Sequence, residues 1–173
     1  MRIAVLGAGS IGCLVAAKLV EAGHDVLVHA RGEHGAMLAI SGLKVSGIWD
    51  FEINPDQWTV SIDEAGIHPS LEKSFDQSII TCKAKDTEKL SQIAALITNG
   101  PVLSLQNGLG NLEILNRFVF ENSAVGVTTN AVKRIGPGQI EWVGCGSISV
   151  GGTKGEQFAE TLSMFEAEYS EDL

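Results

Sequence analysis

Residues 2–12 read RIAVLGAGSIG, and the rest of the chain is organised around this stretch. Residues 3–6 form a short, wholly apolar run rich in branched side chains, which predicts a strand buried on both faces of a parallel sheet. From Ile11 onward, apolar residues recur at helical spacing up to Gly23, a residue suited to the end of a helix. A buried strand, a tight turn and a helix are therefore expected at the start of the chain.

Between the strand and the helix lies G-x-G-x-x-G, a motif typical of a dinucleotide-binding turn. Gly7 can make the tight turn, Gly9 would let a pyrophosphate approach the backbone, and Gly12 would let the helix pack close to the strand. The free N–H groups of the first helical turn and the helix dipole would hold the phosphates. The candidate cofactor-binding residues of this turn are Gly7, Ala8, Gly9, Ser10, Ile11 and Gly12. The alternative is a structural turn that binds nothing.

The composition indicates one α/β domain. With 173 residues the chain can bury a sizeable core, although it is small for a two-domain dehydrogenase. The net charge of −9, with no basic cluster larger than Lys133-Arg134, argues against a nucleic-acid partner. No apolar run approaches the roughly 20 residues that span a bilayer, which argues against a membrane partner.

The cysteines and histidines do not suggest a metal site. The three cysteines, at 13, 82 and 145, are odd in number and far apart, so they predict neither a disulfide framework nor a C-x-x-C site. We expect each to be a small core residue in a reducing compartment, which indicates a cytoplasmic protein. The four histidines, at 24, 29, 34 and 68, lack a metal-binding helical spacing and are interpreted as surface or loop residues.

The end of the second strand bears on cofactor choice. This strand is expected over about 25–30, and in a dinucleotide-binding fold its end lies beside the adenosine ribose. An Asp or Glu there would bind the 2′-OH of NAD, but this strand ends in His29-Ala30-Arg31. An arginine fork suits a 2′-phosphate, and no carboxylate stands at this position to repel it. The sequence therefore favours NADP over NAD, the alternative for Arg31 being a solvent-exposed loop residue.

The later segments continue the alternation of strands and helices. Further strands are expected at 58–62, 78–82, 102–105 and 124–127, and helices at 33–40, 86–97 with Asp86 as N-cap, 112–120 and 157–165. Residues 43–55 alternate like a hairpin, and 131–135, 139–143 and 147–150 suggest an antiparallel meander that closes the sheet edge before an acidic tail over 166–173. The predicted fold is a Rossmann-type, doubly wound, mainly parallel sheet with an antiparallel extension near the C-terminus.

Two polar residues follow expected strands at the edge of the sheet where ligands bind in open α/β folds. Lys83 follows the strand over 78–82 and could reach a cofactor; otherwise it is a solvated lysine before the next helix. Asn107 follows the strand over 102–105, and its amide could meet both a nicotinamide and a substrate. Asn-Gly is also a common turn dipeptide, so the position alone leaves both interpretations of Asn107 open.

Five separated stretches resemble the amino-terminal domain of the ketopantoate reductase (2-dehydropantoate 2-reductase) family. They are IAVLGAGSIG at 3–12, HAR at 29–31, TCKA at 81–84, QNGLG at 106–110 and GVTTNAVKR at 126–134. The resemblance covers essentially the whole chain, 1–173, as a dinucleotide-binding domain. It implies that residues 7–12 hold the pyrophosphate, that Arg31 binds the 2′-phosphate and that Lys83 lines the cofactor groove. It also implies that Asn107 contacts nicotinamide and substrate, and that Val132 makes a backbone contact to NADP(H).

The resemblance implies hydride transfer from NADPH to a 2-keto acid in pantothenate biosynthesis. Family members continue into an all-helical domain that supplies the catalytic lysine and most of the substrate pocket, so no catalytic residue is expected within this chain. The simplest explanation is a fragment that is inactive alone and needs the missing domain or a second subunit. The alternatives are the cofactor domain of another 2-keto or 3-hydroxy acid dehydrogenase, or a non-catalytic NADPH-sensing module.

Overall fold

The central sheet of the fold is built around the apolar strand at the start of the chain. The structure is a computed structural model that describes residues 1–63, 66–107 and 110–173. Within these residues, eight strands form the sheet in the spatial order β12-β11-β8-β7-β6-β1-β2-β5. Their bounds are β1 Arg2–Leu6, β2 Asp25–Ala30, β5 Thr59–Ile62, β6 Gln77–Ile80, β7 Val102–Leu105, β8 Ser123–Thr128, β11 Ile148–Gly151 and β12 Glu168–Tyr169. Neighbouring strands are parallel except β8 and β11, which confirms the predicted sheet.

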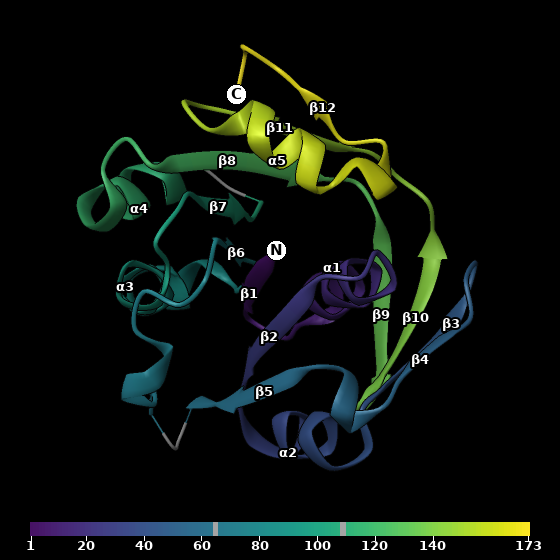
Figure 1. The fold of residues 1–173 in the computed structure, drawn as a ribbon. Coiled ribbons are helices and arrows are strands. Elements are labelled where there is room, and N and C mark those ends of the chain that lie inside the picture. Colours follow the sequence, from purple (N-terminus) through teal and green to yellow (C-terminus); the bar gives the residue numbers. More distant parts are fainter. Residues whose placement is uncertain (64–65, 108–109) are drawn as a thin grey trace.

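Helices cover both faces of this sheet (Figure 1). Their bounds are α1 Ser10–Glu21, α2 Gly32–Ser41, α3 Thr87–Ile97, α4 Asn111–Val119 and α5 Gly155–Thr161, with short 3₁₀ turns at Pro55–Gln57, Pro69–Leu71, Ala84–Asp86 and Ser163–Phe165. On β1, Ile3 and Val5 join a core cluster with side chains of α1 and α5, whereas Ala4 and Leu6 join a second cluster with α3 and α4. Burial on both faces explains why the strand is apolar throughout.

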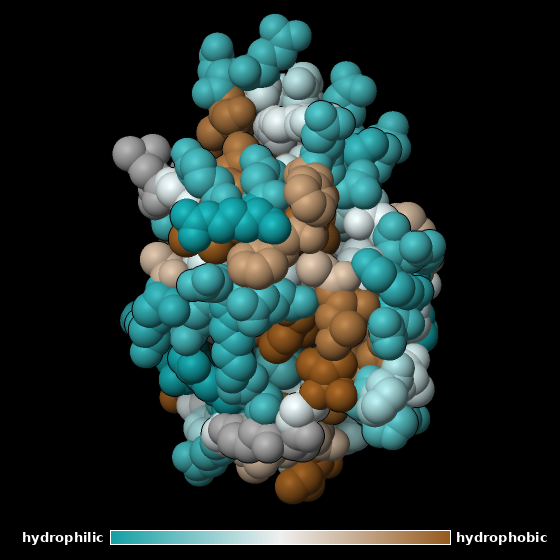
Figure 2. Space-filling model, turned by 90° about the vertical axis from the view of Figure 1, so that its left-hand side faces the viewer, coloured by the Kyte–Doolittle hydropathy of each residue, from teal (hydrophilic) through white to brown (hydrophobic). Residues whose placement is uncertain are grey.

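The outer surface over α3 and α4 is mostly hydrophilic. Figure 2 views the molecule from the side on which these two helices lie and shows polar side chains over most of it, with apolar ones between them. On α3, Leu90, Ala94 and Ile97 are buried against the sheet. The helix is thus amphipathic, as its spacing predicted.

The order of the strands reverses beside β1. From β1 the chain proceeds outward to β2 and β5, then crosses to β6 on the other side of β1 and continues outward through β7 and β8. Ligands of open α/β sheets bind at such a switch point, outside the carboxyl ends of the strands. Here the switch point lies between the glycine turn after β1 and the segment after β6. These two segments are joined by the Thr81 hydroxyl, which donates a hydrogen bond of 2.6 Å to the Gly7 carbonyl oxygen.

A second, four-stranded sheet within the described residues overturns part of the predicted meander. Its order is β4-β3-β10-β9, with bounds β3 Leu43–Gly47, β4 Phe51–Ile53, β9 Ala131–Gly136 and β10 Gln139–Gly144. The meander was expected to close the edge of the main sheet, but of its three strands β11 alone joins that sheet. β9 instead pairs with β10, and β10 pairs in parallel with β3, which forms a hairpin with β4.

The second sheet covers the face of α1 that points away from the main sheet (Figure 1). Lys18 of α1 lies with its ammonium 3.6 Å from the centroid of the Trp49 ring, which stacks on Phe51 of β4. Trp142 of β10 lies beside Trp49 in an edge-on arrangement. Because α1 is enclosed by two sheets, it is buried around most of its circumference, and the hairpins have an apolar surface to pack against.

Several smaller expectations are corrected. Cys13 is buried, but Cys82 is half-buried and Cys145 is exposed, so the cysteines are not all core residues. The acidic tail contains β12, which pairs in parallel with β11. Within the described ranges, no helix combines the length and apolarity needed to cross a bilayer.

Candidate functional site

The switch point of the main sheet opens into a cavity of about 750 Å³. Its wall is formed by residues 7–9 after β1, 29–31 at the end of β2, 81–83 after β6 and 134–137 at the tip of the second sheet. Side chains from α2, α3 and the end of β5 complete it. Of the predicted site residues, the structure brings Gly7, Ala8, Gly9, Arg31 and Lys83 together here, whereas Ser10, Ile11, Gly12, Asn107 and Val132 do not line the cavity among the described residues.

The three glycines of the turn differ in whether, and for what structural reason, a glycine is needed at each position. Gly7 has φ +112°, and a side chain there would meet the backbone of Cys82 at 2.9 Å. A side chain at Gly12 would collide with the Gly7 carbonyl oxygen, so this glycine allows close packing of α1. Gly9 has an ordinary extended backbone, φ −76° and ψ −170°, and no described atom lies within 4 Å of the position of an added Cβ. Neither backbone nor packing requires glycine at position 9, where the wall is open toward the cavity.

The first turn of α1 offers hydrogen-bond donors beside this opening. Gly9 is the N-cap residue, and it has no side chain that could cap the helix. The first N–H groups of a helix have no partner within the helix, so those at residues 10–12 are available to an anion. Ser10, Ile11 and Gly12 therefore belong to the turn through their backbone, although their side chains do not line the cavity.

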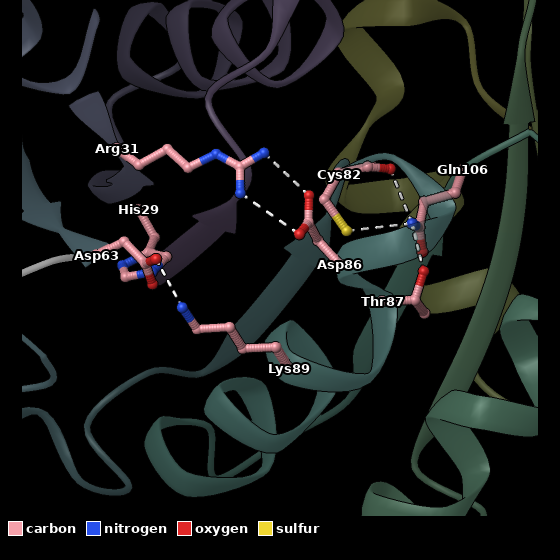
Figure 3. A network of polar contacts seen from close by, with 8 residues as sticks. All are labelled: His29, Arg31, Asp63, Cys82, Asp86, Thr87, Lys89 and Gln106. Atoms are coloured by element: carbon pink, nitrogen blue, oxygen red, sulfur yellow. Dashed lines mark hydrogen bonds and ion pairs between the residues drawn. The ribbon is translucent and has the colours of Figure 1, made fainter. Parts of the chain in front are cut away.

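Arg31 lies in the cavity wall, and a carboxylate faces it. Its guanidinium donates to both carboxylate oxygens of Asp86, at 3.0 Å from Nη2 and 3.4 Å from Nη1 (Figure 3). The sequence placed no carboxylate at the strand end, but the fold brings this one from the start of α3, 55 residues away. Asp86 holds the predicted N-cap position of α3, yet its side chain makes no capping hydrogen bond and is directed at Arg31.

A second polar group lies along the same wall. His29 is buried, and its Nε2 lies 3.1 Å from Asp63 Oδ1, while Lys89 donates to Asp63 Oδ2 at 2.6 Å (Figure 3). The hydrogen bond from Lys89 is the largest of the effects that hold the pKa of Asp63 below its ordinary value. His34 is also buried, with its Nδ1 accepting from the Gly138 N–H at 3.0 Å. The interpretation of all four histidines as surface or loop residues is therefore wrong for these two, which are buried on β2 and α2.

A buried polar network fixes the segments after β6 and β7. The Gln106 amide donates to the Cys82 carbonyl oxygen at 2.8 Å and to the Thr87 hydroxyl at 3.0 Å (Figure 3). Thr87 donates in turn to Asn111 Oδ1 at 3.2 Å, and Ser104 donates to Gln106 Oε1 at 2.8 Å. The network thus ties together the loops that carry Lys83 and Asn107. It was missed because a lone glutamine after a strand gives no signal of burial.

The Cys82 thiol lacks the environment of a reactive cysteine. Burial is the main reason why its pKa rises to about 11, and the nearby Asp86 carboxylate adds to the shift. Reactive cysteines instead have lowered pKa values.

The remaining predicted residues do not line the cavity. Asn107 is exposed at the carboxyl end of β7, and the motif residues Gly108 and Leu109 lie outside the described residues. Val132 lies on β9, further along the strand from the tip that lines the cavity, and its cofactor contact stays a prediction.

The cavity is locally basic although the chain is acidic. Its described lining holds the basic residues Arg31, Lys83, Lys85, Lys89 and Arg134, against the acidic residues Glu33, Asp63 and Asp86. Such an excess of positive charge suits a phosphorylated ligand. Arg134 was noted in the sequence only as half of a basic pair, because its approach to the site depends on how the second sheet packs.

Comparison with known proteins agrees with this geometry. The model of the family described as ketopantoate reductase PanE/ApbA matches residues 3–155. A 2-dehydropantoate 2-reductase from Pyrococcus horikoshii is 36% identical over 152 residues, which cover 87% of this chain and 47% of the relative. One from Archaeoglobus fulgidus is 34% identical over 165 residues, covering 95% of this chain and 52% of the relative. The chain therefore spans about half the length of the curated relatives it matches.

Solved structures show the same fold. D-mandelate dehydrogenase in complex with NADH and anilino(oxo)acetate superimposes with a TM-score of 0.85 at 27% identity, covering 99% of this chain and 57% of that one. A PanE/ApbA family ketopantoate reductase from Ralstonia eutropha gives a TM-score of 0.83 at 28% identity, with coverage of 99% and 57%. The resemblance found in the five sequence stretches is thus confirmed across nearly the whole chain.

Proposed function

Because the chain belongs to the ketopantoate reductase PanE/ApbA family, we propose that residues 1–173 are the NADPH-binding domain of a 2-dehydropantoate 2-reductase. The bound nicotinamide would supply a hydride to the keto carbon of ketopantoate, giving pantoate. Support comes from the curated 2-dehydropantoate 2-reductases and from the NADH complex of the similar D-mandelate dehydrogenase.

The observation that carries the proposal is the open space at Gly9. A glycine that neither the backbone nor the neighbouring atoms require is explained by a ligand that passes against the main chain. The free N–H groups at the start of α1 lie beside this position, as a pyrophosphate requires.

The other residues receive roles according to their place around the cavity. We assign the pyrophosphate to the turn over 7–12, the 2′-phosphate to Arg31 and a wall of the cofactor groove to Lys83. Asn107 would contact the nicotinamide and the substrate, and Val132 would offer a backbone contact. The group that protonates the substrate carbonyl would come from residues outside this chain.

The test compares two glycines of the same turn. Gly9→Val places methyl groups in the open space, so NADPH binding should be lost while the melting temperature stays near that of the unsubstituted chain. Gly12→Ala collides with the Gly7 carbonyl, so it should lower stability by about 1–3 kcal/mol, the usual cost of overpacking. Fluorescence titration with NADPH and thermal melting by circular dichroism check both variants. NADPH binding retained by Gly9→Val would contradict the proposed path of the pyrophosphate.

A second candidate is the cofactor domain of a reductase for a different 2-keto acid. It is favoured by the similarity to D-mandelate dehydrogenase, whose complex contains anilino(oxo)acetate. Both candidates use the same nicotinamide site. The two candidates can be distinguished in a protein that has the full length of the relatives, by comparing its rates of reduction of ketopantoate and of benzoylformate.

A further inference from the structure

The Arg31–Asp86 pair places opposite charges where the proposed function needs a phosphate site. The two hydrogen bonds, at 3.0 and 3.4 Å, join one edge of the guanidinium to both carboxylate oxygens. The Asp86 side chain is 22% exposed and that of Arg31 58%, so the pair faces the cavity and can be reached by a ligand.

Among the described residues, no side-chain hydrogen bond or ion pair other than the one with Arg31 holds the Asp86 carboxylate in this position. It occupies the N-cap of α3, where an aspartate normally accepts a hydrogen bond from the first helical turn, but it makes no such bond. The other described acidic side chain that is paired in this wall, Asp63, is bonded to Lys89 and lies near His29. The carboxylate that competes for Arg31 is therefore that of Asp86.

The two nicotinamide cofactors would meet this pair differently. A 2′-phosphate carries a charge of about −1.5 to −2 at neutral pH, so it must displace Asp86 from Arg31 and then remain close to a like charge. A 2′-hydroxyl carries no charge and can donate a hydrogen bond to a carboxylate, as in NAD-binding sites. Asp86 thus opposes the binding of NADPH, which carries the 2′-phosphate, and can favour the binding of NADH, which carries the 2′-hydroxyl.

We propose that Asp86 is a specificity-determining residue that narrows the preference for NADPH over NADH, so that Arg31 and Asp86 together, rather than Arg31 alone, set cofactor choice. This inference rests on the proposed nicotinamide-binding function and deepens it. It implies that the chain binds both cofactors.

The test is the ratio of NADH to NADPH dissociation constants, measured by titration calorimetry with the 173-residue chain. Asp86→Asn keeps the shape of the side chain and removes its charge. It should tighten NADPH binding by about 3- to 30-fold, the range for removing one like charge at about 4 Å in a partly exposed site. NADH binding should stay the same or weaken. Glu88→Gln removes the same charge from an exposed residue two positions along α3, outside the cavity, and should change neither constant by more than about twofold.

The possible outcomes separate the two proposals. If both cofactors bind but Asp86→Asn leaves their ratio unchanged, or weakens NADPH because Asp86 positions Arg31 for the phosphate, this inference is wrong and the proposed function stands. An equal gain in NADPH affinity from Glu88→Gln would show a general charge effect and also overturn it. If neither cofactor binds the unsubstituted chain or the variant, the proposed function fails and the inference fails with it.

Discussion

Arg31 carries a charge that a ligand can reach from the cavity. It is the N-cap residue of α2 and has an extended backbone, so its side chain leaves the end of β2 toward the start of α3 rather than lying along α2. A guanidinium in this position can exchange its carboxylate partner for a phosphate, because both accept the same paired N–H donors.

Replacing Arg31 tests its proposed role directly. Arg31→Ala should weaken NADPH binding by about 1.5–3 kcal/mol, the value of a charge-assisted hydrogen bond, and should leave NADH binding nearly unchanged. Arg117→Ala, on the exposed surface of α4, is a matched control for the loss of one arginine. Titration calorimetry with both cofactors measures the effect, and equal losses for the two would contradict the assignment to the 2′-phosphate.

Some features of single residues could be predicted from the sequence, whereas others depend on contacts between distant residues. The glycine turn and Arg31 could be predicted as cavity residues because their signals are local: a motif between strand and helix, and a residue type at a strand end. The Asp86 carboxylate and the burial of His29 were missed because they depend on side chains 55 and 34 positions away. Neither spacing nor composition encodes such a distance.

At the scale of elements, His34 joins three parts of the fold. It lies on α2, its Nδ1 accepts from the Gly138 N–H in the turn between β9 and β10, and its Nε2 lies 3.4 Å from the Cys13 sulfur on α1. Burial, and to a lesser degree the charge of Arg134, holds the pKa of His34 below its ordinary value. The neutral ring is the form that can accept from Gly138.

This contact predicts how stability depends on pH. The unfolded chain takes up a proton on His34 at higher pH than the folded chain does, so stability should fall as pH decreases from about 6.5 through the lower folded pKa. His34→Gln keeps an acceptor and removes the titration, so it should reduce this dependence. Urea unfolding at about pH 7.5 and about pH 5.5 measures both proteins. A variant with the pH dependence of the unsubstituted chain would contradict this role. His24, whose pKa is also lowered, mainly by burial, should contribute in the same direction in both proteins.

The boundaries of most elements followed from the sequence, whereas the pairing of the hairpins did not. Alternation at 43–55 predicted the hairpin of β3 and β4, because period two is a local property of a strand with two different faces. The same pattern does not identify the partner strand. β10 pairs with β3 across 95 residues, from Lys44 to Gln139, and the apolar surface that both hairpins cover belongs to α1.

At the scale of the whole molecule, both sheets contribute walls to the cavity. The main sheet brings the carboxyl ends of β1, β2 and β6 to one crevice, and the second sheet adds residues 134–137 as a further wall. Every proposed phosphate contact lies within the described part of this chain. Asn107, at the end of β7, is the residue proposed to face the nicotinamide and the substrate, and it lies outside the cavity wall.

We therefore expect the 173-residue chain alone to bind NADPH but not to reduce ketopantoate. Binding should persist because the glycine turn, Arg31 and Lys83 lie around one cavity. Reduction should fail because the proposed proton donor lies outside the chain: general acid catalysis contributes about 10²- to 10⁴-fold, and positioning of the substrate contributes more. Oxidation of NADPH, followed by its absorbance with saturating ketopantoate, is measured beside a fluorescence titration of NADPH. Turnover at the roughly 1–10³ per second of ordinary enzymes would place the catalytic group within these residues and overturn the assignment.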